Sequence, residues 1–206
     1  MKNYLCSALI LLAMVSCDSK KEAVKTSYKT PDMKLASDVM TPEVLWSFGR
    51  IGSVSVSPDQ KTLLYDVTYF NKEEDRSYSD IYVMNLADGK SQQLTDTDYK
   101  EFGETWTSDG KIAFMSSKSG SVQLWEMNAD GSGLTQLTNV EGGIGGFIFS
   151  PDKSKLLFLK DVKLEQDVHD LHPDLPKANA RLIDGQVYRH WNDWEEAYTH
   201  PFVADY

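Results

Sequence analysis

The sequence contains only two cysteines, Cys6 and Cys17, among 206 residues. Both lie in an N-terminal segment that looks like a cleavable leader, and Cys6 would leave with it. The folded part of the chain would then hold no disulfide and no thiolate metal site. We therefore expect no cofactor and no structural metal of the cysteine type.

Positive charge is also scarce. The chain has 21 Lys and Arg residues against 31 Asp and Glu residues, for a net charge of −10. Nucleic acids and anionic lipid surfaces select basic protein faces, so this balance argues against both as electrostatic partners. The hydrophobic content of 41% and the charged content of 25% are ordinary for a globular chain and allow a real core.

No apolar run is long enough to cross a membrane as a helix. The longest run, Tyr4–Val15, follows Lys2 and has the length of a signal-peptide core. Because small residues and then Cys17 follow it, the segment is typical of a bacterial lipobox. We expect residues 1–16 to be a lipoprotein signal peptide, Cys17 to carry the lipid, and residues 17–35 to be a flexible tether in the bacterial cell envelope, on the periplasmic side or at the surface. Ordinary secretion with cleavage nearby is the alternative.

What the sequence does contain is repetition. The stretches SPDQKTLLY (57–65) and SPDKSKLLF (150–158) are close copies, and TSDGKIAF (107–114) is a weaker one. The tripeptide Leu-Thr-Asp at Leu94 returns as Leu-Thr-Asn at Leu137, after 43 residues. Four short strands in each unit of 40–45 residues are the pattern of a propeller blade.

Each unit follows one order of strands and turns. A first strand leads into the Ser-Pro-Asp turn, a second and a third strand follow, an Asp-Gly turn comes next, and a fourth strand ends in Gln-Leu-Thr. The predicted strands are 51–56, 62–69, 80–85 and 93–95 in the first unit, 111–116, 122–128 and 136–138 in the second, and 146–149 and 155–160 in the third. The surplus residues of the first unit, Tyr69–Asp80, would form a longer loop.

The expected fold is therefore all-β. We predict a partial β-propeller over residues 36–206, with about two and a half blades of four antiparallel strands. A short helix should precede it, because Thr41 suits the N-cap and Pro42 the first helical position. A β-sandwich with regular turns is the alternative.

One family shares these features. The SPD, DGS and QLT repeats resemble TolB-type propellers and the propellers of prolyl oligopeptidase family serine peptidases. The segment Asp174–Glu196, with its core YRHWNDW (188–194), resembles the insertion of dipeptidyl-peptidase 5 and acylaminoacyl-peptidase relatives. The resemblance covers about residues 36–206.

The resemblance implies a substrate-gating propeller in a lipoprotein-anchored serine exopeptidase, which takes a peptide substrate. Such enzymes carry their Ser-Asp-His triad on an α/β-hydrolase domain, and this sequence has no G-x-S-x-G motif. We assign no catalytic residue to the chain and expect it to be inactive alone. The missing blades and the hydrolase domain would be its partners in a larger enzyme. A TolB-like binding module for a protein partner, or a non-functional truncated remnant, are the alternatives.

The substrate-binding residues would come from an insertion in the third blade, residues 161–200. Glu195 and Glu196 could hold the free N-terminus of a peptide, with Arg189 and Trp194 beside them. Long insertions tend to be functional or disordered.

A structural role for the same aromatic residues is the alternative. Trp191 and Trp194 would then anchor the core, and Arg189 would pair with Asp193.

The same region contains residue types that can bind a metal. Asp167, His169, Asp170 and His172 could form a cluster, but the segment is typical of a polar loop, and we expect no metal there.

Overall fold

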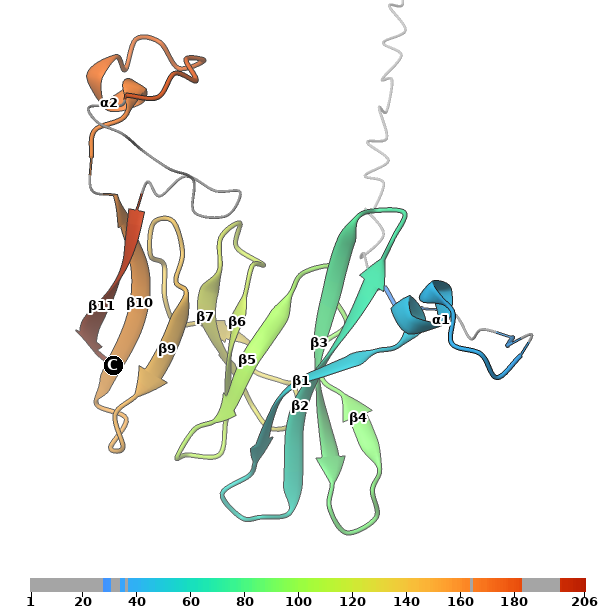
Figure 1. The fold of residues 1–206 in the computed structure, drawn as a ribbon. Coiled ribbons are helices and arrows are strands. Elements are labelled where there is room, and N and C mark those ends of the chain that lie inside the picture. Colours follow the sequence, from blue (N-terminus) through green and yellow to red (C-terminus); the bar gives the residue numbers. More distant parts are fainter. Residues whose placement is uncertain (1–27, 31–33, 36, 164, 183–196) are drawn as a thin grey trace, which may run out of the picture.

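The computed structural model describes residues 28–30, 34, 35, 37–163, 165–182 and 197–206. The described chain forms three antiparallel sheets and two short helices. The sheets stand side by side in chain order, with the second sheet between the first and the third (Figure 1).

The first sheet has the order β1-β2-β3-β4, the second β5-β6-β7-β8, and the third β11-β10-β9. The bounds of the first blade and its helix are α1 (Pro42–Ser47), β1 (Arg50–Val56), β2 (Thr62–Asn71), β3 (Arg76–Asn85) and β4 (Ser91–Gln93). Those of the second blade are β5 (Glu101–Trp106), β6 (Ile112–Ser116), β7 (Gln123–Met127) and β8 (Thr135–Gln136). The third has β9 (Gly146–Phe149), β10 (Lys155–Lys163), α2 (Val168–Leu171) and β11 (Ala197–Asp205).

This arrangement confirms the predicted fold of four-stranded antiparallel blades. Two blades are complete and a third has three described strands. The short helix is confirmed as well: the hydroxyl of Thr41 accepts a hydrogen bond from the amide of Val44 at 3.3 Å, and Pro42 opens the helix.

The Ser-Pro-Asp motif and its weaker copy form the same turn in all three blades. The first residue donates its hydroxyl to the aspartate at 2.6 Å in each pair, Ser57–Asp59, Thr107–Asp109 and Ser150–Asp152. The residue after the aspartate is left-handed, with φ of 59° at Gln60, 79° at Gly110 and 59° at Lys153. The repeat therefore preserves a turn geometry, in which the side chain of the aspartate stabilises the bend.

The fourth strands end two residues earlier than predicted. They end at the glutamine of each Gln-Leu-Thr motif, and the threonine leaves the ladder. Its hydroxyl replaces a strand partner by accepting a backbone N–H at 2.9 Å, from Ile81 to Thr95 and from Leu124 to Thr138. The motif recurs because the threonine hydroxyl satisfies an amide that the short strand does not reach.

The prediction of a long loop at Tyr69–Asp80 was wrong. β2 and β3 stay paired from Thr62↔Asn85 to Asn71↔Arg76, so that the surplus residues lengthen a hairpin. Tertiary packing supports this extension, because the ring of Trp46 in α1 lies edge-on to Phe70 at 5.3 Å and the guanidinium of Arg50 lies 4.4 Å from the same ring.

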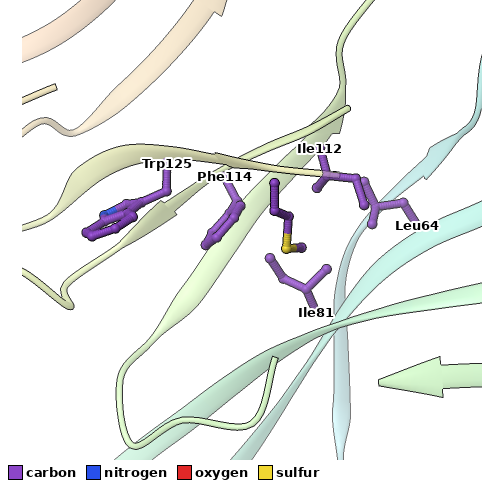
Figure 2. Packing of buried hydrophobic residues seen from close by; sticks show 6 residues of the cluster. Leu64, Ile81, Ile112, Phe114 and Trp125 are labelled. Atoms are coloured by element: carbon purple, nitrogen blue, oxygen red, sulfur yellow. The ribbon is translucent and has the colours of Figure 1, made fainter. Parts of the chain in front are cut away.

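The core lies between the blades. Leu64 and Ile81 of the first blade meet Ile112 and Phe114 of the second (Figure 2). The intervening residues of the second blade turn the other way, and Met115 packs toward the third. Since β6 and β7 are buried on both faces, they lose the polar alternation of half-exposed strands.

Candidate functional site

The predicted substrate-binding residues Arg189, Trp194, Glu195 and Glu196 lie outside the described residues. The predicted lipidation site, Cys17, lies outside them too. Both assignments remain predictions.

The structure does describe the stem of the insertion. β10 and β11 pair without interruption from Lys155↔Asp205 to Lys163↔Ala197. Residues at both ends of the predicted insertion 161–200 therefore belong to the two strands. The segment that connects the strands is shorter, 164–196. Thr199 donates its hydroxyl to Asp161 at 2.5 Å across this stem. The stem lies at the end of the third blade from which α2 projects (Figure 1).

The acidic residues near α2 cap the N-terminus of this helix. The carboxylate of Asp167 accepts the amides of His169 and Asp170, at 2.8 and 3.0 Å, as an N-cap. Lys163 pairs with both carboxylates and, with these amides, lowers the pKa of Asp167 to about 2. Among the described residues no group of three or more His, Cys, Asp or Glu side chains is arranged to hold a metal ion.

A groove of about 560 Å³ lies between β5 of the second blade and β9 of the third. Its walls combine aromatic and aliphatic side chains with hydroxyls, a lining that suits an apolar side chain or segment. The principal lining residues are Thr105, Trp106, Met115, Phe147, Phe149 and Lys153.

Lys153 closes one side of this groove with charged hydrogen bonds. Its ammonium lies 2.6 Å from Asp109 and 2.9 Å from Glu126. Burial lowers the pKa of Lys153, but the two hydrogen bonds outweigh burial and raise it above its ordinary value. The same contact, together with the hydroxyl of Thr107, lowers the pKa of Asp109 to about 2. The ammonium is therefore fully charged and joins two blades.

A second polar cluster lies between the first and second blades. Glu104 of β5 and Asp66 of β2 are 3% and 4% exposed, and both approach the hydroxyl of Ser53 in β1. Burial is the largest cause that raises the pKa of Glu104 to about 7, and the negative charge of Asp66 adds to it.

Glu101, on the same strand, is buried in a comparable way. It accepts the hydroxyl of Thr97 at 2.7 Å and lines a cavity of about 130 Å³ with Trp125 and Lys118. Burial raises the pKa of Glu101 to about 7, although hydrogen bonds from threonines oppose the rise.

Sequence reasoning missed these buried carboxyls. The available signal was a glutamate at positions 101 and 104 of a predicted blade, where the neighbouring blades carry isoleucine, valine or phenylalanine. A single acidic residue in a half-buried strand is ordinary, and only the packing of blade on blade shows that both side chains are enclosed.

Two blades of four antiparallel strands and a third with three described strands define a chain of the β-propeller class. No family model matches the chain. The dipeptidyl-peptidase 5 of Porphyromonas gingivalis is 43% identical over 167 residues, which are 81% of this chain and 24% of that protein. The dipeptidyl-peptidase 5 of Porphyromonas endodontalis is 34% identical over 198 residues, 95% of this chain and 29% of that protein.

Among solved structures, the acylaminoacyl peptidase of Pyrococcus horikoshii superposes with a TM-score of 0.58 at 17% identity, over 78% of this chain and 24% of that one. This likeness concerns the fold. Together the comparisons confirm the resemblance to dipeptidyl-peptidase 5 and to acylaminoacyl-peptidase-like propellers. The chain spans about a quarter of the length of the curated relatives it matches.

Proposed function

We propose that this chain is the substrate-gating propeller of a serine exopeptidase that releases short units from peptide N-termini. The observation that carries the proposal is the 43% identity with a dipeptidyl-peptidase 5 over 81% of the chain, on a fold of propeller blades. The reaction would belong to an α/β-hydrolase domain outside these 206 residues, because the chain has no G-x-S-x-G motif.

The propeller would act by restricting and orienting the substrate. A peptide that enters a cavity beside the blades reaches the catalytic serine only in an extended, oriented form, and orientation lowers the entropic part of the barrier. The insertion that rises from the β10–β11 stem would supply the carboxylates Glu195 and Glu196 for the α-ammonium of the peptide, with Arg189 and Trp194 in the same cavity.

The enzyme would work at the cell envelope, held by lipid on Cys17. The sequence pattern of residues 1–17 supports this. In the part of the chain that the structure describes, no helix is both long and apolar enough to span a membrane. A Cys17→Ala variant should leave the membrane fraction or keep its leader; membrane association that survives the change would contradict the lipid anchor.

The experiment that tests the proposal uses the full-length enzyme encoded with this sequence. Wild type, Glu195→Gln and Glu196→Gln are assayed on one peptide in free and in N-blocked form. Loss of a carboxylate that binds the ammonium should cost about 2–4 kcal/mol in kcat/KM on the free peptide and little on the blocked one. Glu165→Gln, an exposed residue of the same insertion, is the matched control.

Two results would contradict the proposal at different points. Absence of peptidase activity in the full-length protein would contradict the proposed exopeptidase function. Equal kinetics of both variants on both peptides would leave the peptidase intact and return Glu195 and Glu196 to a structural role.

A further inference from the structure

In the contact between the first and second blades, two carboxyl groups share one serine hydroxyl. Oγ of Ser53 lies 3.1 Å from Oδ1 of Asp66 and 3.0 Å from Oε1 of Glu104. A serine hydroxyl has one proton, so it donates to only one of these oxygens. The second short distance is a hydrogen bond only if that carboxyl carries a proton of its own.

The other donors decide which carboxyl is ionised. Asp66 also accepts the amide of Ser53 at 2.8 Å on Oδ1 and the hydroxyl of Ser79 at 3.2 Å on Oδ2. Glu104 has weaker support: a backbone hydrogen bond and the hydroxyl of Ser53 favour its ionised form, but its Oε2 is buried and meets no hydrogen-bond partner among the described residues. Several donors stabilise a carboxylate, while a buried carboxyl that has fewer donors and one oxygen without a partner keeps its proton more readily. Asp66 is therefore the ion and Glu104 the acid.

The backbone is shaped around this pair. β1 and β5 both shift register next to it, between Ile51 and Val54 and between Phe102 and Thr105. A Cβ on Gly52 would lie 2.3 Å from Oδ1 of Asp66, so only glycine leaves room for the carboxylate. The pair thus occupies a built site and is not a chance approach of two side chains.

We propose that the face between β5 and the first blade is a pH-sensitive joint, in which the proton on Glu104 holds the two blades together. When that proton leaves, two carboxylates face each other in a buried contact with one serine hydroxyl between them. Repulsion and the cost of burying a second charge then favour separation of the blades or entry of water.

The groups around the joint contain little positive charge to offset this. β2 presents Asp66, β1 presents the uncharged Ser53, and β3 presents Ser79. At the far end of β5, Glu101 faces Asp80 of β3, and Lys118 after β6 is the cation that lowers the pKa of Glu101. Burial and the charge of Asp66 raise the pKa of Glu104 to about 7, so the joint would respond near neutral pH.

The sign of the effect follows from linkage. The folded chain binds the proton of Glu104 more tightly than the unfolded chain, whose glutamate titrates near 4.5. The stabilisation is complete below about pH 4.5 and is lost as the pH rises through about 7. For this single group the folding equilibrium constant should fall on the order of 100-fold across that window.

The first test titrates the 206-residue chain itself. Glutamate carboxyl carbons are followed by 13C NMR from pH 4 to 9, and Glu104→Gln identifies the resonance. One glutamate assigned to position 104 should titrate near pH 7; a midpoint below about 5 would overturn the proposal. Because Glu101 should also titrate near pH 7, Glu101→Gln provides the assignment if Glu104→Gln fails to fold: the glutamate that still titrates near pH 7 in this variant lies at position 104.

The second test asks whether the joint opens. Amide hydrogen exchange is compared at pH 6 and pH 8 after correction for intrinsic rates. Exchange should accelerate more in β5 and at Ser53 than in β6 or β7, and Glu104→Gln should abolish this excess. Glu73→Gln, an exposed glutamate of the β2–β3 turn, should behave as wild type. Proton release without faster exchange at β5 would overturn the opening of the joint.

Discussion

Nζ of Lys153 lies 2.9 Å from Oε2 of Glu126, and this ion pair joins the turn of the third blade to the third strand of the second. Both side chains are largely buried, and the phenol of Tyr206 donates to the same glutamate at 3.2 Å. Lys153 holds a left-handed backbone conformation to reach this place. The same turn position is glycine in the second blade and glutamine in the first, so the contact is specific to this blade boundary.

Lys153→Met should destabilise the chain by about 2 kcal/mol, because Glu126 keeps Lys111 but loses its buried partner. Urea unfolding at pH 7 measures the change. Lys155→Met is the control: its ion pair with Asp205 is exposed, and its removal should alter stability by less than about 0.5 kcal/mol. Equal effects of the two substitutions would show that the Lys153 contact is no stronger than a surface pair.

Gln60→Gly should stabilise the chain by about 1 kcal/mol. Gln60 has φ of 59°, a left-handed conformation that costs free energy for any residue with a Cβ, and the equivalent position of the second blade is already Gly110. Thermal unfolding measures the shift. Lys61→Gly, one residue further and outside the left-handed region, should destabilise; stabilisation by both changes would contradict the reason given.

Gly52→Ala should destabilise the chain by about 1–3 kcal/mol, because the new Cβ would lie 2.3 Å from the Asp66 carboxylate. Denaturant unfolding provides the number. Gly145→Ala offers a matched comparison at the start of the third blade, where the nearest atom, on Leu159, is 3.9 Å from the new Cβ. A tolerated alanine at position 52 would mean that the backbone around Asp66 adapts easily.

Glu101→Gln should remove part of the pH dependence of stability. Burial raises the pKa of Glu101 from 4.5 to about 7 in the folded chain. Its stabilisation is therefore present below about pH 4.5 and is lost as the pH rises through about 7, a loss on the order of 3 kcal/mol. Urea midpoints of wild type and variant between pH 4 and 8 test this, and identical slopes would refute it.

Asp109 predicts the opposite trend at acid pH. Its folded pKa is lowered to about 2, first by the hydrogen bond from Lys153. The stabilisation it provides is present above about pH 3.8 and is lost as the pH falls through about 2. Asp109→Asn should flatten the acid limb of the stability curve. Asp88→Asn, an exposed carboxylate of a hairpin turn, should leave that limb unchanged.

Much of the fold could be predicted because the blades repeat short motifs whose geometry is local. The Ser-Pro-Asp turn is stabilised by its own aspartate, and Gly89 and Gly131 have the positive φ, 69° and 85°, that their hairpin turns require. Thr41 and Pro42 mark the helix start for equally local reasons. The hairpin turns and the order of the blades follow from such signals.

Errors arose where tertiary contacts overrode composition. The polar stretch Tyr69–Asp80 is typical of a loop, but packing of Trp46 and Arg50 on Phe70 supports a paired ribbon. The Gln-Leu-Thr ends are less strand-like than predicted, because the threonine hydroxyl replaces a ladder bond.

The sequence by itself determined the repeat, the turns, the antiparallel blades and the resemblance to dipeptidyl-peptidase 5, since each depends on residues close together in the chain or on identity along it. Only the tertiary structure decided which polar side chains are enclosed. Glu104 and Asp66 are 38 positions apart, and no local signal shows that the two side chains meet. The two carboxyl groups share the hydroxyl of Ser53 and a buried proton because the two blades pack face to face and exclude water. Without this packing, both side chains would be ordinary surface carboxylates.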